Sequence, residues 1–127
     1  MIDHVSTTVA DIEKARAFYD AVLGSLGAVR VMNAEHGPIA ISGYGRGGKP
    51  SFWIAGGTGE APALAGHVAF AAPDRGTVDA FYKAAIAAGA TDNGAPGPRP
   101  HYHENYYGAF VIDPDGNRLE AVCHAPA

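Results

Sequence analysis

An internal repeat constrains the fold of this 127-residue chain more than any other sequence feature. The segment HVSTTVADIEKARAFY, residues 4–19, aligns without a gap with HVAFAAPDRGTVDAFY, residues 67–82. The copies share His-Val at the start, an aspartate in the middle and Ala-Phe-Tyr at the end, always 63 positions apart. Matches at three separated places indicate an internal duplication of a unit of about 60 residues.

Each copy is predicted to begin with a short strand and a helix. In the first copy Asp11 is placed to cap a helix over residues 12–24, whose apolar side chains follow the i, i+3, i+4, i+7 spacing of one buried face. In the second copy Asp74 or Thr77 caps a similar helix, and Gly89 ends it in the left-handed conformation. Tyrosines 19 and 82 lie on these apolar stripes, so we expect core positions for them.

Short runs of the β type, separated by glycine and proline, follow each helix. The expected strands are residues 29–32, 38–44 and 50–56 in the first copy, and a weak strand near Thr91, 106–112 and 117–124 in the second. Asp-Pro-Asp-Gly at 113–116 predicts a hairpin turn with positive φ at Gly116. Each copy therefore reads βαβββ. Residues 56–66 are expected to link the copies, and 91–100 to form a proline-rich loop at the surface or beside a cleft.

Composition and charge narrow the choice of partners. Hydrophobic residues make up 47% and charged residues 17%, as in folded globular proteins. The net charge is −4 and no segment gathers Lys and Arg, which argues against nucleic acid and anionic membranes as partners. We expect neither a secretory signal nor a membrane span. The single cysteine, Cys123, is expected to be a small buried hydrophobe in a cytoplasmic protein.

The duplication gives two histidines one shared explanation. His4 and His67 begin equivalent strands, which a pseudo-twofold axis would place side by side, and converging imidazoles are a common way to bind a metal ion. Glu120, between Leu119 and Ala121, supplies a candidate third ligand, because a carboxylate in an apolar strand must be either solvated or paired. Two histidines and one carboxylate form a facial triad that leaves metal positions open for substrate.

These motifs resemble the vicinal oxygen chelate superfamily, which includes glyoxalase I, extradiol dioxygenases, fosfomycin-resistance transferases and bleomycin-resistance proteins. The resemblance rests on DHVSTTVADIEKARAFYDAVLG at the start, GHVAF opening the second copy and DPDGNRLE near the end, and it covers nearly the whole chain. It implies an α+β fold in which two paired βαβββ modules, about 1–57 and 65–125, form one domain over residues 1–127. A curved mixed sheet would surround a metal-binding cleft, with the helices outside.

The resemblance also implies a set of site residues. His4, His67 and Glu120 stand at three of the family's four ligand positions, and the fourth falls on Trp53, or on Phe52 if the register shifts by one. Neither aromatic residue binds a metal, which departs from the glutamate of bacterial glyoxalase I and matches the pattern of the transferases and dioxygenases. The family further implies a homodimer with clefts shared between chains, so that His4 could join His67 and Glu120 of the partner.

The segment PHYHENYYG, residues 100–108, is a second concentration of functional groups. If it is extended, His101 and His103 point to one face and Tyr102, Glu104 and Tyr106 to the other. Together with Glu120, the groups of His101, His103 and Tyr106 are the catalytic candidates, as general acids or bases or as contacts to a polar substrate. The alternative is a polar loop with aromatic anchors.

Three functions are compared at this point, and a thiol transferase also remains open, although no basic cluster is present for a phosphonate. The first is a metal-dependent lyase or isomerase of the glyoxalase I type, which acts on a small oxygenated substrate, or its thiol adduct, chelated through neighbouring oxygens. The second is an Fe(II) extradiol-type dioxygenase, and the third is a non-catalytic binding protein like the bleomycin-resistance members. The cofactor is a divalent metal ion, and imidazole and carboxylate ligands suit Zn, Ni, Mn and Fe alike.

Overall fold

The computed structural model describes residues 1–57 and 67–127, and the chain divides into two compact units, Met1–Ala63 and Leu64–Ala127. The boundary agrees with the modules expected from the repeat. Most of the predicted linker, 56–66, lies outside the described residues. Whether the two units make one domain stays a prediction.

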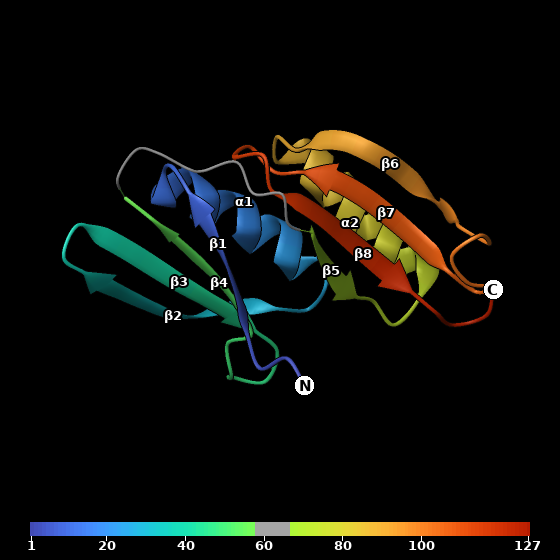
Figure 1. The fold of residues 1–127 in the computed structure, drawn as a ribbon, viewed down its shortest axis with the longest axis horizontal. Coiled ribbons are helices and arrows are strands. Elements are labelled where there is room, and N and C mark those ends of the chain that lie inside the picture. The colour runs from blue at the N-terminus through green and yellow to red at the C-terminus, as the bar shows by residue number, and fades with distance from the viewer. Residues whose placement is uncertain (58–66) are drawn as a thin grey trace. The chain divides into compact units, whose positions relative to one another are not determined.

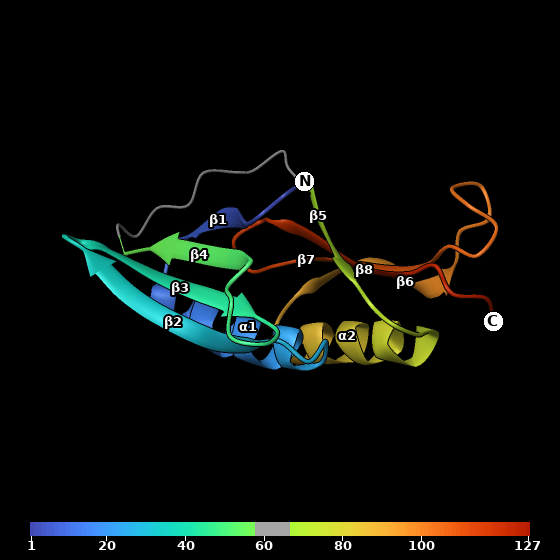
Figure 2. The same ribbon diagram turned by 90° about the horizontal axis from the view of Figure 1, so that it is seen from below.

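The first unit is a four-stranded mixed sheet with one helix (Figure 1). The strand order is β1-β4-β3-β2, in which β1 pairs with β4 in parallel and the other neighbours are antiparallel. Figure 2 shows the helix on one face of this sheet. The elements are β1 (Val5–Val9), α1 (Ile12–Gly24), β2 (Val29–His36), β3 (Ile39–Gly45) and β4 (Phe52–Gly56).

The second unit repeats this topology. Its sheet has the order β5-β8-β7-β6, with β5 parallel to β8 and the other pairs antiparallel, and its helix also covers one sheet face (Figure 2). The elements are β5 (His67–Ala71), α2 (Arg75–Ala87), β6 (Thr91–Pro98), β7 (Tyr107–Ile112) and β8 (Arg118–Cys123). The α+β prediction with two βαβββ modules is therefore confirmed.

Both helices begin as their sequences predict. The Asp11 carboxylate accepts hydrogen bonds from the backbone amides of Glu13 and Lys14, at 3.0 and 3.2 Å. At the second helix Asp74, rather than Thr77, is the N-cap, and its carboxylate accepts from the amide and hydroxyl of Thr77. Each cap supplies an acceptor for amides that have no partner within the helix.

Each unit has its own apolar core between helix and sheet. In the first, the Tyr19 ring packs against Phe52 with centroids 5.2 Å apart, and both are buried. In the second, Phe81 of α2 and Leu119 and Cys123 of β8 are buried. The core positions predicted for Tyr19 and Cys123 are confirmed. Tyr82 is only partly buried, because its hydroxyl reaches Asp92 at 3.0 Å.

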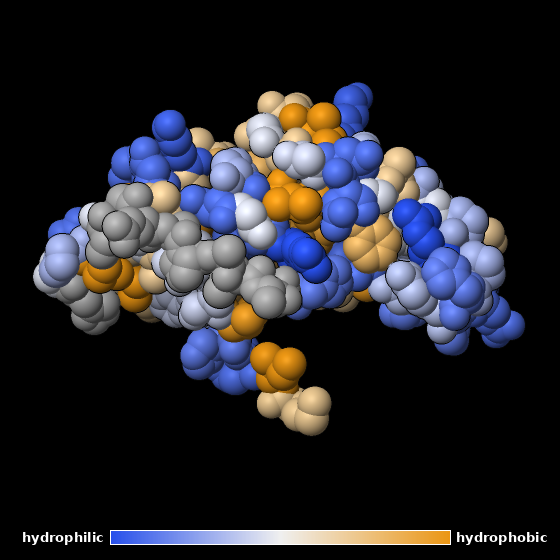
Figure 3. All heavy atoms as spheres, turned by 45° about the horizontal axis from the view of Figure 1, so that its top comes forward, coloured by the Kyte–Doolittle hydropathy of each residue, from blue (hydrophilic) through white to orange (hydrophobic). Residues whose placement is uncertain are grey.

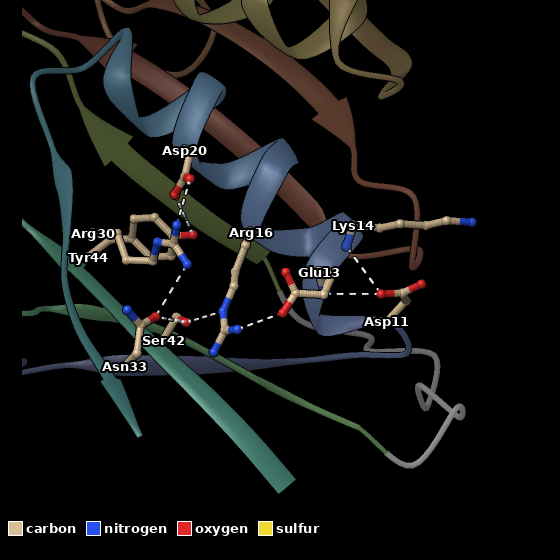
Figure 4. A network of polar contacts seen from close by, with 9 residues as sticks. All are labelled: Asp11, Glu13, Lys14, Arg16, Asp20, Arg30, Asn33, Ser42 and Tyr44. Atoms are coloured by element: carbon tan, nitrogen blue, oxygen red, sulfur yellow. Dashed lines mark hydrogen bonds and ion pairs between the residues drawn. The ribbon is translucent and has the colours of Figure 1, made fainter. Parts of the chain in front are cut away.

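A polar network lies between α1 and the sheet of the first unit (Figure 4). The fully buried Ser42 donates to Asn33 at 2.7 Å and accepts from the Arg16 guanidinium at 2.8 Å. Nearby, the Tyr44 hydroxyl donates to Asp20 at 3.0 Å. Burial, and then the Asp20 charge, raises the pKa of Tyr44 well above its usual value. These bonds satisfy polar groups that would otherwise weaken the core.

Two segments differ from the expectation. Residues 91–98, expected mainly as a proline-rich loop, form strand β6, because β6 is an edge strand and prolines there need not donate to a neighbour on the free side. The strand expected at 29–32 continues to His36 in an antiparallel ladder with β3. The turn at 113–116 is confirmed, with φ of 89° at Gly116.

The surface carries a few large hydrophobic side chains, among them Met32, Ile86 and Tyr102. On the face that Figure 3 shows, hydrophobic atoms form small separate areas among hydrophilic ones. Across residues 1–57 and 67–127, no helix is both long and apolar enough to cross a membrane.

Candidate metal-binding site

The second unit brings together His67 and Glu120, two of the three predicted ligands. Strand β5 begins at His67 and runs parallel to β8, in a register that pairs Ala69 with Glu120. Both side chains leave the sheet on the face opposite α2, since Phe70, on the alternate face, packs against Phe81 of the helix. His67 Nε2 lies 2.7 Å from Glu120 Oε1.

Glu120 is a buried carboxylate held by two partners. Only 2% of the residue is exposed, and its second oxygen, Oε2, accepts a hydrogen bond from the hydroxyl of Tyr106. Burial, followed by the hydrogen bond to Glu120 and its charge, raises the pKa of Tyr106 above its ordinary value. The phenol therefore stays protonated at neutral pH and donates a hydrogen bond to the carboxylate. Of the two alternatives for Glu120, a solvated or a paired carboxylate, the structure shows the paired one.

A glycine makes room for this arrangement. A Cβ atom at Gly108 on β7 would lie 3.0 Å from Glu120 Oε2 and 3.1 Å from the Tyr106 ring. Any side chain at this position would press against both partners. Gly108 therefore lets the carboxylate and the phenol meet over the sheet.

Aromatic and cationic groups border the pair. The His67 ring stacks on Phe110, with centroids 6.2 Å apart and an angle of 28° between the planes. The Arg99 guanidinium lies over the same phenyl ring, 5.4 Å from its centroid. Sequence reasoning missed Phe110 and Arg99. The alternation along 107–112 could have placed Phe110 on the face of Glu120, but no sequence signal indicated where Arg99 would lie.

The other catalytic candidates lie in the connection between β6 and β7. Residues 100–105 form turns, as in the polar-loop alternative, and not an extended stretch, because Arg99 and Tyr106 close the loop with a backbone bond of 2.7 Å. His101 and His103 therefore do not alternate with Tyr102 as in a strand. The His101 ring packs on Tyr102 at 4.3 Å and the His103 ring on His124 at 5.7 Å. Of the three candidates from this segment, the structure joins only Tyr106 to Glu120.

The third predicted ligand, His4, belongs to the first unit. Its Nδ1 lies 2.8 Å from Asp3 Oδ1, and the other oxygen of Asp3 lies 2.7 Å from Lys49 Nζ. Lys49 first, and then His4, lower the pKa of the exposed Asp3 carboxyl to about 2. Asp3 is therefore a charged acceptor that fixes the orientation of the His4 ring. Within neither unit, over the residues described, do three His, Cys, Asp or Glu side chains gather as for a metal ion.

The register identifies the counterpart of Glu120 in the first unit. Trp53 pairs with Ser6, just as Glu120 pairs with Ala69, and Ser6 and Ala69 are 63 positions apart like the repeat itself. Trp53, and not Phe52, therefore stands at the position in the first unit that matches Glu120 in the second. Phe52 points to the other face, where Tyr19 covers it. Trp53 and His4 line an open pocket of about 160 Å³ with Ser6, Ile41 and Ala55.

Solved structures of the glyoxalase/bleomycin resistance protein type are similar to nearly the whole chain. A glyoxalase/bleomycin resistance protein from Albidiferax ferrireducens T118 is 31% identical, with 95% of this chain and 97% of that chain covered and a TM-score of 0.75. An enzyme of the glyoxalase/bleomycin resistance protein/dioxygenase family from Burkholderia phytofirmans PsJN is 25% identical, with 98% of both chains covered and a TM-score of 0.71.

Glyoxalase I from Zea mays has a similar fold. It is 18% identical, with 99% of this chain but only 45% of that chain covered and a TM-score of 0.75. No curated protein matches the chain. The model of the Glyoxalase/Bleomycin resistance protein/Dioxygenase superfamily matches residues 1–121. The duplicated βαβββ units and this match show that the chain belongs to the glyoxalase/bleomycin resistance protein/dioxygenase superfamily.

Proposed function

We propose that this protein is a metal-dependent enzyme of the glyoxalase type, with lyase or isomerase chemistry on a small substrate that binds through two neighbouring oxygens. The observation that carries the proposal is the close pair of His67 and Glu120 on one sheet face of a superfamily member. Superfamily membership and the fold shared with glyoxalase I support the choice of chemistry.

The geometry of the pair fits a divalent ion. An imidazole nitrogen and a carboxylate oxygen are both common ligands of divalent ions. His67 Nε2 and Glu120 Oε1, which lie 2.7 Å apart in a hydrogen bond, would hold such an ion in place of the shared proton. Tyr106 holds the other carboxylate oxygen, which leaves Oε1 for the ion. Zn, Ni, Mn and Fe all accept this donor set.

His4 is the proposed third ligand. When its Nδ1 carries the proton and donates it to Asp3, Nε2 keeps a free lone pair, and a carboxylate partner of this kind orients metal-binding histidines. His4 would meet the pair within one chain or, in a homodimer, across two chains. A homodimer that acts on a small molecule in the cytoplasm, without nucleic acid or membrane, completes the proposal.

The side chains around the proposed ion have different proposed roles in catalysis. The bound ion would supply Lewis-acid polarisation of the two substrate oxygens. Tyr106 carries a proton that it donates to Glu120, so it positions the carboxylate and is not itself a base. Glu120 is the proposed general acid or base: when a substrate takes the place of Oε1 at the ion, this oxygen can accept a proton from the substrate and return it. His101 and His103, which are exposed, are proposed as secondary proton carriers or polar contacts.

Elemental analysis after equilibration with divalent metals tests the proposal. The wild type should retain about one ion per chain, and His67→Ala and Glu120→Ala should each lose most of it. Glu104→Ala is a matched control for Glu120→Ala, because it removes a carboxylate from an exposed position and should leave the metal content unchanged.

The outcomes separate the possible functions. Zinc or nickel together with isomerisation of a hemithioacetal supports the proposed enzyme. Iron together with oxygen uptake on catechols would favour the dioxygenase instead. Equally little metal in the wild type and in both site variants would refute the metal site and favour a non-catalytic binding protein.

A further inference from the structure

The first unit carries an open pocket on the sheet face opposite α1. Its walls are Ile41 of β3, Trp53 and Ala55 of β4, and Ser6 and His4 at the start of the chain, and its volume is about 160 Å³. Three of these residues are apolar and lie together on β3 and β4, where Ile41 pairs with Ala55. The polar residues Ser6 and His4 come from the segment of β1.

The sheet beneath the pocket holds the indole of Trp53 in a fixed place. A Cβ atom at Gly43 would lie 2.9 Å from two carbons at the far edge of the indole and 2.8 Å from Cβ of Pro50. The far edge of the indole therefore lies over Gly43 of β3, in a space that only glycine leaves open, with Pro50 beside it. A flat aromatic surface that is already ordered binds another ring with little loss of side-chain entropy.

The size of the pocket indicates what it can bind. A closed apolar cavity of roughly 150 Å³ accommodates a benzene molecule; this pocket has about 160 Å³ but is open, so it has room for one ring whose substituents extend out of it. We propose that the first unit binds a small aromatic ring against Trp53, so that the substrate is an aryl compound with oxygens on the carbons next to the ring.

The polar edge of the pocket explains why the oxygens lie close to the ring. His4 lines the pocket and is also the proposed metal ligand, and Ser6 adds a hydroxyl beside it. A ring on Trp53 thus places its nearest substituents at His4. In this respect the inference rests on the proposed function and specifies the substrate class for the same site, while binding of the ring itself requires no metal.

Trp53 is the only tryptophan of the chain and reports directly on its own pocket. The probes are mandelate and lactate, which carry the same hydroxyl and carboxylate on neighbouring carbons and differ in a phenyl against a methyl group. Each is titrated into the full chain, first with a chelator and then with zinc, while tryptophan fluorescence is recorded. We expect mandelate to change the emission saturably, with a midpoint at least about tenfold below that of lactate.

Two variants locate the effect. Ala55→Leu fills the pocket and should abolish the preference for mandelate, whereas Ala21→Leu adds the same bulk to an exposed position of α1 and should preserve it. Circular dichroism and urea midpoints show whether both variants remain folded. If Ala55→Leu unfolds, Ala55→Val provides the same test with less added volume.

The results separate this inference from the proposed function. Equal midpoints for mandelate and lactate, no saturable change with mandelate, or a preference that survives in a folded Ala55 variant would overturn the aromatic pocket even if zinc binds. A preference that persists with the chelator would support the pocket independently of the metal, and the elemental analysis of the wild type and the His67 and Glu120 variants would then decide the metal site separately.

Discussion

Removal of the Tyr106 hydroxyl tests whether this phenol holds Glu120 in place. The substitution Tyr106→Phe leaves the ring but takes away the donor to Oε2 of a carboxylate that is only 2% exposed. A hydrogen bond to a charged group contributes about 1.5–3 kcal/mol to stability. We therefore expect the free energy of unfolding to fall by about 1.5–3 kcal/mol at neutral pH.

The neighbouring tyrosine provides a matched control. Tyr107 also donates to a carboxylate, that of Asp79 at 2.7 Å, but this pair is exposed and lies on the helix side of the sheet. Tyr107→Phe should therefore cost only about 0.5–1 kcal/mol. Urea unfolding of the three proteins, with equal m-values, gives both differences.

Metal titration adds a second readout to the same variants. Loss of a group that orients a ligand typically weakens metal binding about 10–100-fold, so Tyr106→Phe should bind zinc more weakly while Tyr107→Phe binds it like the wild type. In a Glu120→Gln background the stability cost of Tyr106→Phe should shrink, since the charged acceptor is gone. If Tyr106→Phe costs no more than Tyr107→Phe and leaves zinc affinity unchanged, the phenol does not hold Glu120.

Three further predictions concern the first unit. Asp11→Ala removes the N-cap of α1 and should destabilise the protein by about 0.5–2 kcal/mol in urea unfolding, whereas Asp11→Asn should retain most of the cap. Because burial and the Asp20 charge raise the pKa of Tyr44 in the folded state, the contribution of Tyr44 to stability should be constant below pH of about 10 and fall at higher pH, where the unfolded chain ionises first. Tyr44→Phe should flatten the fall in stability above pH of about 10, and an unchanged slope would contradict the assignment. Gly45→Ala would place a Cβ atom 1.9 Å from the carbonyl oxygen of Lys49, so it should lower the free energy of unfolding by about 1–3 kcal/mol. A urea midpoint equal to that of the wild type would show that the backbone at Lys49 can move without cost.

The repeat made much of this fold predictable from the sequence. Residues that recur 63 positions apart fixed the two units, and Asp11 predicted its helix start because capping depends on adjacent residues alone. The closeness of His67 and Glu120 also followed, since both come from strands with a defined order in the repeated unit. Whether His4 joins them stays a prediction.

The parts that were not predicted depend on contacts between distant segments. Strand β6 forms through a ladder with β7 that outweighs the turn preference of its glycines and prolines. Residues 100–105 turn because Arg99 bonds to Tyr106 across the loop. Tyr106, which donates to Glu120, lies at the end of this loop, so local sequence patterns do not encode their hydrogen bond.

The positions that break the symmetry of the two units come as a pair. On β3 and β4 of the first unit, Gly43 faces Trp53; on β7 and β8 of the second, Phe110 faces Glu120 in the same register. The aromatic ring of each pair thus lies on β4 in the first unit, as Trp53, and on β7 in the second, as Phe110. A mutation of Trp53 to glutamate alone would leave the space over Gly43 empty, and filling it would take a larger side chain at position 43. The residue that can stand at position 53 is therefore coupled to the packing of the adjacent strand.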